Sequence, residues 1–209
     1  LAFYARVFGS TIEENYDLVK DVYEQVAPFK KRLAGKLSGG MKQKLALSCA
    51  LIHRPEILIL DEPTTGVDAV SRKEFWEMLK KVQQSGITIV VSTPYMDEAA
   101  LCDRVALMQK GHVLQVDSPS AIMDSFPKRL FAVKSENQYE LLSYLKTNDR
   151  VFSVFPFGQY MHVTFSDDNN DADEFFRRLK RVGYPDVESF RVSATIEDVF
   201  MHLMSNKND

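Results

Sequence analysis

A serine followed by two glycines, Ser38-Gly39-Gly40, stands directly before the apolar-periodic segment MKQKLALSCALIH, residues 41–53. This pattern predicts a helix whose first backbone N–H groups are not covered by bulky side chains. Such a helix end attracts anions, because unpaired N–H groups and the positive end of the helix dipole meet there, and glycines let a phosphate come close. An ordinary serine N-cap followed by a turn is the alternative interpretation.

An acidic pair, Asp61-Glu62, follows the short apolar run EILIL, residues 56–60. The run is typical of a buried parallel strand. Ligands of open α/β sheets bind at the carboxyl ends of the strands, where two carboxylates can serve a metal ion and an attacking water separately. A solvated acidic turn is the alternative, but the Ser-Gly-Gly segment upstream and residues 64–68, TTGVD, downstream favour a phosphate site.

The elements that must position these residues follow from hydrophobic periodicity. Helical patterns cover residues 1–9 and 11–26, and the second opens with the capping box TIEE. After the acidic pair we expect a helix over residues 71–84, a strand over 87–92 and a short helix around 97–101. A hairpin joined at Lys110-Gly111 and a short helix from Ser118 to about Pro127 complete this part. The alternation of strands and helices predicts an α/β domain.

From residue 128 the pattern changes to strand, helix, two strands, helix, strand and a final helix. This order approximates βαββαβ, a ferredoxin-like plan with one added helix, and predicts a separate small α+β domain. We therefore expect two domains, residues 1–127 and 128–209. Aromatic strands next to the basic residues of the segment 177–181 could also form an RNA-binding sheet, but the adjacent acidic segment 167–174 and the fit of the aromatics to a core favour a packed domain.

Composition bounds the possible functions. A chain of 209 residues with 45% hydrophobic content can bury a substantial core. Lys and Arg number 26 against 29 Asp and Glu, so the net charge of −3 indicates no nucleic-acid partner. The longest apolar runs are far shorter than the roughly 18 residues of a membrane span. Cys49 and Cys102 lack metal-ligand spacing and are expected to be small buried hydrophobic residues in a reducing compartment.

Four segments together resemble one family. LSGGMKQKL, residues 37–45, is similar to the signature loop of ABC ATPases, ILILDEP, residues 57–63, to their Walker B strand, and GVDAV, residues 66–70, to their D-loop. ITIVVSTPYMDEAA, residues 87–100, resembles their switch segment. The order matches the family through residues 1 to about 125. The resemblance implies an α/β fold, a partial P-loop NTPase domain with a helical subdomain, and an ATPase activity coupled to transport.

The resemblance also implies roles for individual residues. Asp61 would hold Mg²⁺ through water, and Glu62 would orient or deprotonate the water that attacks the γ-phosphate of ATP. Ser38, Gly39 and Gly40 would contact the γ-phosphate of ATP bound to an opposite subunit. Asp68 would line the dimer seam. A head-to-tail dimer of two nucleotide-binding domains, identical or different, is therefore implied.

Two departures from the family pattern limit these expectations. No GxxxxGK[ST] phosphate-binding loop occurs in the sequence. We therefore expect an N-terminally truncated chain that by itself neither binds ATP tightly nor hydrolyses it. The switch segment carries Pro94 where the family has a histidine, and proline cannot donate a hydrogen bond to the γ-phosphate. The site would then be slow or silent and paired with a competent partner domain, or another group would replace the histidine.

The C-terminal segment TIEDVFMHLM, residues 195–204, is similar to extensions of the ATPase subunits of ABC-2-type exporters. We therefore expect an ATP-binding subunit that powers separate membrane-spanning subunits and lies in the cytoplasm against the inner face of the membrane. Two alternatives stay open: a degenerate, non-hydrolysing regulatory domain paired with an active one, and a soluble ABC ATPase without a transport role. Tandem cassettes, basic linkers and coiled-coil or zinc insertions, which soluble members carry, are not visible in the sequence.

Overall fold

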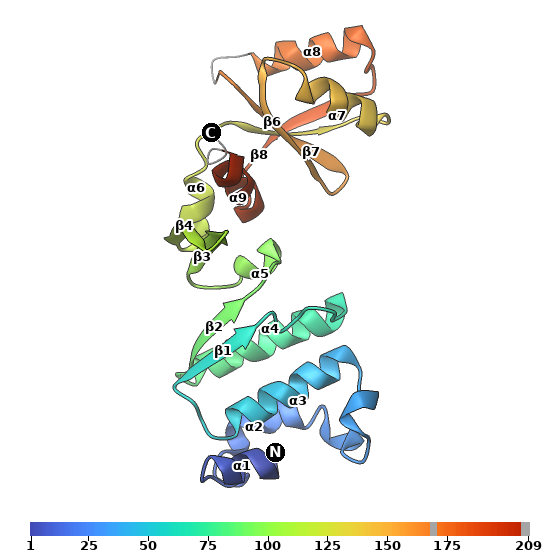
Figure 1. Ribbon diagram of the computed structural model, residues 1–209. Coiled ribbons are helices and arrows are strands. Elements are labelled where there is room, and N and C mark those ends of the chain that lie inside the picture. Colours follow the sequence, from blue (N-terminus) through green and yellow to red (C-terminus); the bar gives the residue numbers. More distant parts are fainter. Residues whose placement is uncertain (168–170, 206–209) are drawn as a thin grey trace. The chain divides into compact units, whose positions relative to one another are not determined.

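The computed structural model describes residues 1–167 and 171–205. The chain divides into two compact units, Leu1–Glu98 and Ala99–Asp209, and each is described by itself (Figure 1). This division groups the predicted hairpin and the helix after Ser118 with the C-terminal half. The domain boundary at residues 127 and 128 stays a prediction.

Unit 1 begins with helices, as expected. In chain order these are α1 (Ala2–Val7), α2 (Tyr16–Tyr23), the 3₁₀ turns η1 (Ala27–Phe29) and η2 (Ala34–Lys36), and α3 (Gly39–Leu51). The capping box forms, because Glu14 accepts from the Thr11 N–H at 3.1 Å and Thr11 Oγ1 accepts from the Glu14 N–H at 3.2 Å. The helix that follows starts only at Tyr16 and is shorter than the predicted 11–26 segment. Asn15, which precedes it, is held by a side-chain bond to the carbonyl of Ile52 at 3.0 Å.

A strand–helix–strand arrangement completes unit 1: β1 (Ile57–Asp61), α4 (Ala69–Gln84), β2 (Thr88–Ser92) and the short α5 (Met96–Ala99). The two strands are parallel, and Asp61 lies opposite Ser92 at their carboxyl ends. Helix α4 buries its apolar face in the unit, with Phe75, Trp76, Met78, Leu79 and Val82 all buried. This is the α/β arrangement that the sequence predicts.

The pair of strands is buried on one face rather than on both. Leu58 is buried, whereas Ile57, Ile59 and Val90 are 59%, 74% and 52% exposed. The prediction of a strand buried on both faces is therefore not met by the described residues. The difference arises because β1 and β2 pair with each other and α4 packs against β2 on one face, so alternate side chains point to the other face.

Unit 2 begins with the predicted hairpin, β3 (Val105–Gln109) and β4 (His112–Asp117). Its two turn residues, Lys110 and Gly111, both have positive φ, at 48° and 78°, as a type I′ turn requires. Helix α6 (Pro119–Asp124) follows and is capped by the Ser118 side chain, which accepts from the Ala121 N–H at 3.3 Å. Proline at the first helical position is also as expected.

The remaining elements form the predicted ferredoxin-like plan. They are β5 (Leu130–Lys134), α7 (Gln138–Lys146), β6 (Val151–Phe157), β7 (Tyr160–Phe165), α8 (Ala172–Val182), β8 (Glu188–Val192) and α9 (Ile196–Ser205). The strands lie in the order β6-β7-β5-β8, and each neighbouring pair is antiparallel. The order βαββαβ is thereby confirmed, because β5 lies between β7 and β8 as the two crossover helices require.

Aromatic residues of this sheet divide between its two faces. Phe131 and Phe165 of the sheet pack in the core with Phe175 and Phe176 of α8. The opposite face carries His162, which lies flat against the Phe157 ring at 4.0 Å and contacts Asp198 of α9, with Nδ1 2.7 Å from Oδ1. Burial opposes ionisation of Asp198, but hydrogen bonds from His162 and Thr195 outweigh it and hold the pKa of its carboxyl below the usual value. The His162–Asp198 contact therefore ties α9 to the sheet.

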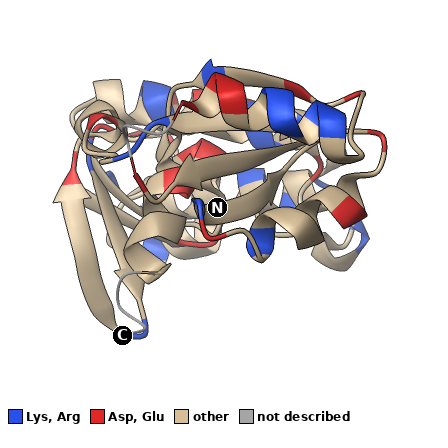
Figure 2. Ribbon diagram, turned by 90° about the horizontal axis from the view of Figure 1, so that it is seen from above, with Lys and Arg blue, Asp and Glu red and all other residues tan. Residues whose placement is uncertain are grey.

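Charges of both signs are interspersed along the helices (Figure 2). Helix α8 has Asp173 and Glu174 in its first turn and Lys180 and Arg181 in its last turn. This distribution complements the helix dipole, which favours acids at the N-terminus and bases at the C-terminus. The basic residues that could have indicated an RNA-binding surface thus have a structural explanation in the helix itself.

Candidate functional site

The acidic pair lies where the two parallel strands end. Ser92 Oγ, at the end of β2, donates a short hydrogen bond to the Asp61 carboxylate, at the end of β1. The backbone N–H of Glu62 points to the same serine, 3.1 Å from its carbonyl oxygen and 3.0 Å from its Oγ. Ser92 therefore fixes both acids relative to the sheet edge. Sequence reasoning placed the pair at this edge but did not identify Ser92 as its partner.

Glu62 has an unusual backbone conformation. Its φ is +43°, in the left-handed region that non-glycine residues rarely occupy. Such a conformation costs on the order of 1–3 kcal/mol and persists where surrounding contacts impose it. Its side chain is exposed and accepts a hydrogen bond from Thr65 Oγ1 at 3.0 Å. The chain thus leaves β1 in a sharp turn that presents the Glu62 carboxylate to solvent.

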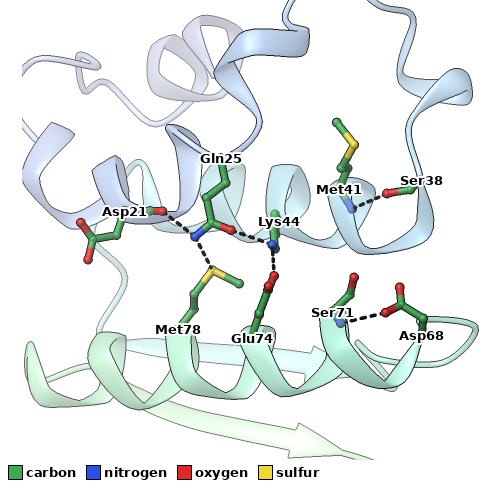
Figure 3. Close-up of polar contacts among 9 residues, drawn as sticks. All are labelled: Asp21, Gln25, Ser38, Met41, Lys44, Asp68, Ser71, Glu74 and Met78. Atoms are coloured by element: carbon green, nitrogen blue, oxygen red, sulfur yellow. Dashed lines mark hydrogen bonds and ion pairs between the residues drawn. The ribbon is translucent and has the colours of Figure 1, made fainter.

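The predicted anion-binding helix end is the N-terminus of α3. Ser38 is its N-cap, and Oγ accepts from the Met41 N–H at 3.3 Å (Figure 3). A Cβ atom at Gly40 would lie 2.7 Å from the Ser71 Cβ, and one at Gly39 would lie 3.2 Å from the Gly66 carbonyl oxygen. The glycines therefore let α3 approach the start of α4 closely. The serine N-cap interpretation is thus confirmed, whereas anion binding at this helix end stays a prediction.

Asp68 is the N-cap of α4. Its carboxylate accepts from the Ser71 N–H at 3.0 Å (Figure 3). Hydrogen bonds from the Ser71 backbone and side chain favour the ionised form and lower the pKa of this carboxyl. The N-termini of α3 and α4 thus lie side by side, and the two segments that resemble the signature loop and the D-loop are parts of one packed surface.

A buried ammonium group holds these two helices together. Lys44 Nζ, on α3, lies 2.6 Å from Glu74 Oε2 of α4 and 2.6 Å from Gln25 Oε1 beyond α2 (Figure 3). Gln25 in turn contacts the Asp21 carbonyl at 3.1 Å. A buried lysine requires such partners, because desolvation of an unpaired charge is costly. Lys44 itself, a basic residue in the signature segment, is the sequence signal that could have predicted this contact.

The predicted site residues therefore fall into two groups with separate contacts. Ser38, Gly39 and Gly40 meet the loop before α4, where Asp68 lies. Asp61 and Glu62 meet Ser92. Pro94 is exposed in the loop after β2.

Each of the two groups carries atoms that suit part of a metal-bound nucleotide. A carboxylate oxygen such as that of Asp61 is a ligand type that Mg²⁺ prefers, usually together with water and substrate phosphate oxygens. The N-terminus of α3, a helix of 13 residues, supplies the positive end of a helix dipole. Within residues 1–167 and 171–205, no three His, Cys, Asp or Glu side chains lie close enough to hold a metal ion together.

Comparisons with known proteins identify the family of this chain. The family model described as ABC transporter matches residues 9–65. The chain is 35% identical over 189 residues to the probable multidrug ABC transporter ATP-binding protein YbhF of Escherichia coli K12, covering 87% of this chain and 31% of that protein. It is 30% identical over 207 residues to Nod factor export ATP-binding protein I of Mesorhizobium japonicum, covering 97% of this chain and 58% of that protein. The chain belongs to the ABC transporter ATP-binding family.

The chain spans between about a third and three fifths of the length of these two ABC relatives. Among solved structures, cbiO1 of Clostridium perfringens, described as part of the ABC transporter complex cbiONQ, is similar over 54% of this chain and 47% of its own. The TM-score is 0.46 and the sequence identity is 29%. Across the described part of this ABC chain, no helix has the length and apolar character needed to cross a bilayer.

A substitution at Gly40 of this ABC chain tests the packing between α3 and α4. Gly40→Ala is expected to lower the free energy of unfolding by about 1–3 kcal/mol, because the new methyl group would overlap the Ser71 side chain. Urea unfolding followed by the fluorescence of Trp76, the single tryptophan, measures this change.

Gly35→Ala is the matched control, because a Cβ there meets nothing within 4 Å. Combining Gly40→Ala with Ser71→Gly should remove the overlap, so the double variant is expected to be more stable than the sum of the two single changes predicts. Equal effects of Gly40→Ala and Gly35→Ala would contradict the close packing.

Proposed function

We propose that this chain supplies the signature, Walker B and D-loop parts of the ATP-hydrolysing subunit of an ABC exporter. The observation that carries the proposal is the placement of Glu62, exposed and in a left-handed turn at the end of β1, next to Asp61 and Ser92. The relatives, a probable multidrug transporter subunit and a Nod factor export protein, support export as the direction.

In this proposal the two acids divide the chemistry of the sheet edge. Asp61, held by Ser92, is the residue that would hold Mg²⁺, directly or through water. When bound, such an ion neutralises charge on the phosphate oxygens. Glu62 would accept a proton from the attacking water and orient it toward the γ-phosphate of ATP. Its exposed carboxylate and its single described side-chain bond, to Thr65, leave acceptor capacity for that water.

The N-termini of α3 and α4 would form the second half of the site. Ser38, Gly39 and Gly40 are proposed to meet the γ-phosphate of ATP held by an opposite cassette, with Asp68 at the seam between the two cassettes. Support for this assignment is that the helix ends lie side by side and are anchored through Lys44 and Glu74. The acid pair and the glycine segment rely on different contacts, as expected if they serve two nucleotides.

The proposed partners are a second nucleotide-binding domain, identical or different, and membrane-spanning subunits. The proposed location is the cytoplasm, against the inner face of the membrane. A non-hydrolysing regulatory domain is the second candidate, and Pro94 favours it, because a proline provides neither an imidazole nor a backbone N–H to the γ-phosphate.

A comparison of two proteins tests the proposal. The complete gene product, assembled with its membrane subunits, is expected to hydrolyse ATP in a Mg²⁺-dependent manner. Residues 1–209 alone are expected to show no submillimolar affinity for MgATP in calorimetry, because the sequence contains no GxxxxGK[ST] loop. Absence of hydrolysis in the assembled protein would favour the regulatory alternative. Tight stoichiometric binding by residues 1–209 would overturn the expectation for the isolated chain.

A further inference from the structure

Glu98, at the end of unit 1, is a charged side chain with almost no contact to solvent. It is 2% exposed, in the short helix α5. An ionised carboxylate is rarely buried unless hydrogen bonds and an opposite charge compensate for the loss of water. The groups around Glu98 therefore indicate what the buried charge does.

Two threonine hydroxyls donate to this carboxylate from two different loops. Thr64 Oγ1 lies 2.7 Å from Oε1, and Thr93 Oγ1 lies 2.6 Å from Oε2. Thr64 is itself 1% exposed and stands two residues after Glu62. Thr93 directly follows the last residue of β2. One carboxylate thus joins the loop that leaves β1 to the loop that leaves β2.

A guanidinium group also lies near this carboxylate. Arg72 Nε, on α4, lies 3.7 Å from Glu98 Oε1, and the same guanidinium lies over the Tyr95 ring, 4.7 Å from its centroid. This positive charge offsets the buried negative charge. Arg72 is in the first turns of α4, close to the Asp68 cap. The start of α4 is therefore connected to the same carboxylate as the two loops.

The loop after β2 is also held by a hydrogen bond within the loop itself. Thr93 Oγ1, which donates to Glu98, also accepts from the Tyr95 N–H at 3.1 Å. These two contacts hold the residues on either side of residue 94. The position of Pro94 is therefore set by Thr93 and Glu98, and the position of Glu62 is set by Ser92 and, through Thr64, by Glu98.

We propose that Glu98 is a positioning residue that fixes the loops carrying Glu62 and residue 94 relative to each other and to α4. The inference rests on the proposed function, because it assigns Glu98 to the site that would hydrolyse ATP. Glu98 acts through its neighbours and is not a catalytic residue. Its loss should affect the rate of the chemical step more than the affinity for MgATP, since a small misplacement of a catalytic group lowers the rate without removing binding contacts.

Hydrogen exchange measured by mass spectrometry tests the structural half of this proposal on residues 1–209. Glu98→Gln is expected to speed amide exchange in residues 62–67 and 93–98 about tenfold, the size expected for the loss of one charge-assisted hydrogen bond. Exchange in α2 and α3 should change less than about twofold. Asp97→Asn is the matched control, because Asp97 also contacts Arg72, at 3.4 Å, but is exposed and is not hydrogen-bonded to either threonine in the described contacts.

If Glu98→Gln loses protection throughout unit 1, the variant has unfolded, and a second pair of variants decides. Thr93→Val removes the hydroxyl at nearly constant volume, whereas Thr93→Ser retains it. Only Thr93→Val should speed exchange, and mainly in residues 93–98, because Thr64 keeps its own hydrogen bond to Glu98. Equal exchange in the valine and serine variants, or equal exchange in Glu98→Gln, Asp97→Asn and the unaltered chain, would overturn the proposal.

ATP hydrolysis by the complete gene product tests the expected effect of Glu98 on the rate. Glu98→Gln is expected to lower kcat for ATP hydrolysis about tenfold or more with KM for MgATP changed less than about twofold, and Asp97→Asn should leave both near the unaltered values. A rise in KM with unchanged kcat would overturn the positioning role. If the unaltered gene product does not hydrolyse ATP, the proposed function fails, whereas the exchange experiment still decides whether Glu98 joins the two loops.

Discussion

Replacing Glu62 with glutamine is expected to lower ATP turnover by the complete gene product about 100-fold or more, because general-base catalysis contributes about 10²–10⁴ to such rates. Glutamine has nearly the same shape and the same backbone preferences, so the left-handed turn at φ +43° should be retained. The amide accepts hydrogen bonds but takes no proton from water at neutral pH. Binding of MgATP should persist, since the proposed nucleotide contacts lie elsewhere, and phosphate release measured under saturating ATP gives the turnover.

Glu56→Gln is the matched control for this experiment. Glu56 is exposed and precedes β1, so it lies at the opposite end of the same strand from Glu62. The Glu56→Gln substitution removes the same charge as Glu62→Gln, but just before β1 and away from the carboxyl ends of the strands. Turnover should be close to that of the unaltered protein. A Glu62→Gln protein that retains more than about a third of its turnover would contradict the role of Glu62 as general base.

Local sequence patterns were sufficient to predict the elements that carry the site. The strand ending at Asp61, the helix beginning at the Ser-Gly-Gly segment and the order of strands and helices in unit 2 are all present. These features depend on periodicity, capping residues and turn residues within a few positions of each other. The TIEE capping box formed as well, although the helix after it starts later than the pattern indicated.

The contacts around the acid pair could not be predicted in this way. Ser92 and Glu98 are 31 and 36 residues beyond Asp61 and Glu62 in the chain. They reach the site because β1 and β2 pair in parallel with Asp61 opposite Ser92, a register between segments far apart in the chain that local patterns do not specify. The positive φ of Glu62 could not be predicted from residue preferences either, because glutamate rarely adopts such a conformation.

The role of the two glycines could not be predicted from the local sequence either. A pair of glycines at a helix N-terminus permits close approach of another group, but the pattern does not show whether that group is a ligand or another part of the chain. In this chain the start of α4 occupies the space beside Gly39 and Gly40, at Gly66 and Ser71. An anion could then reach the helix end only from the side that α4 leaves open. The proposal of a nucleotide contributed by an opposite cassette is compatible with that restriction.

Replacing Pro94 with histidine is expected to raise ATP turnover by the complete gene product about tenfold or more, because removal of one preorganised donor in comparable sites costs about 10²–10³ in kcat. The loop should accept the change. Pro94 is exposed, and its neighbours hold the backbone through the Thr93 contacts to Tyr95 and Glu98 rather than through the proline ring. Loss of the ring should reduce stability by only about 0.4–1 kcal/mol.

Pro94→Ala separates the effect of the new imidazole from that of the lost ring. Both substitutions remove the same restraint on φ, but only histidine adds a side-chain donor near the γ-phosphate. Turnover should therefore rise in Pro94→His and remain unchanged or fall in Pro94→Ala, measured at the same saturating MgATP concentration. Equal increases in the two variants would mean that proline limits the rate by rigidity, and unchanged or lower turnover in Pro94→His would mean that another group already supplies the donor. Because Thr93 and Glu98 fix the loop in either case, the difference between the variants reports on the donor alone.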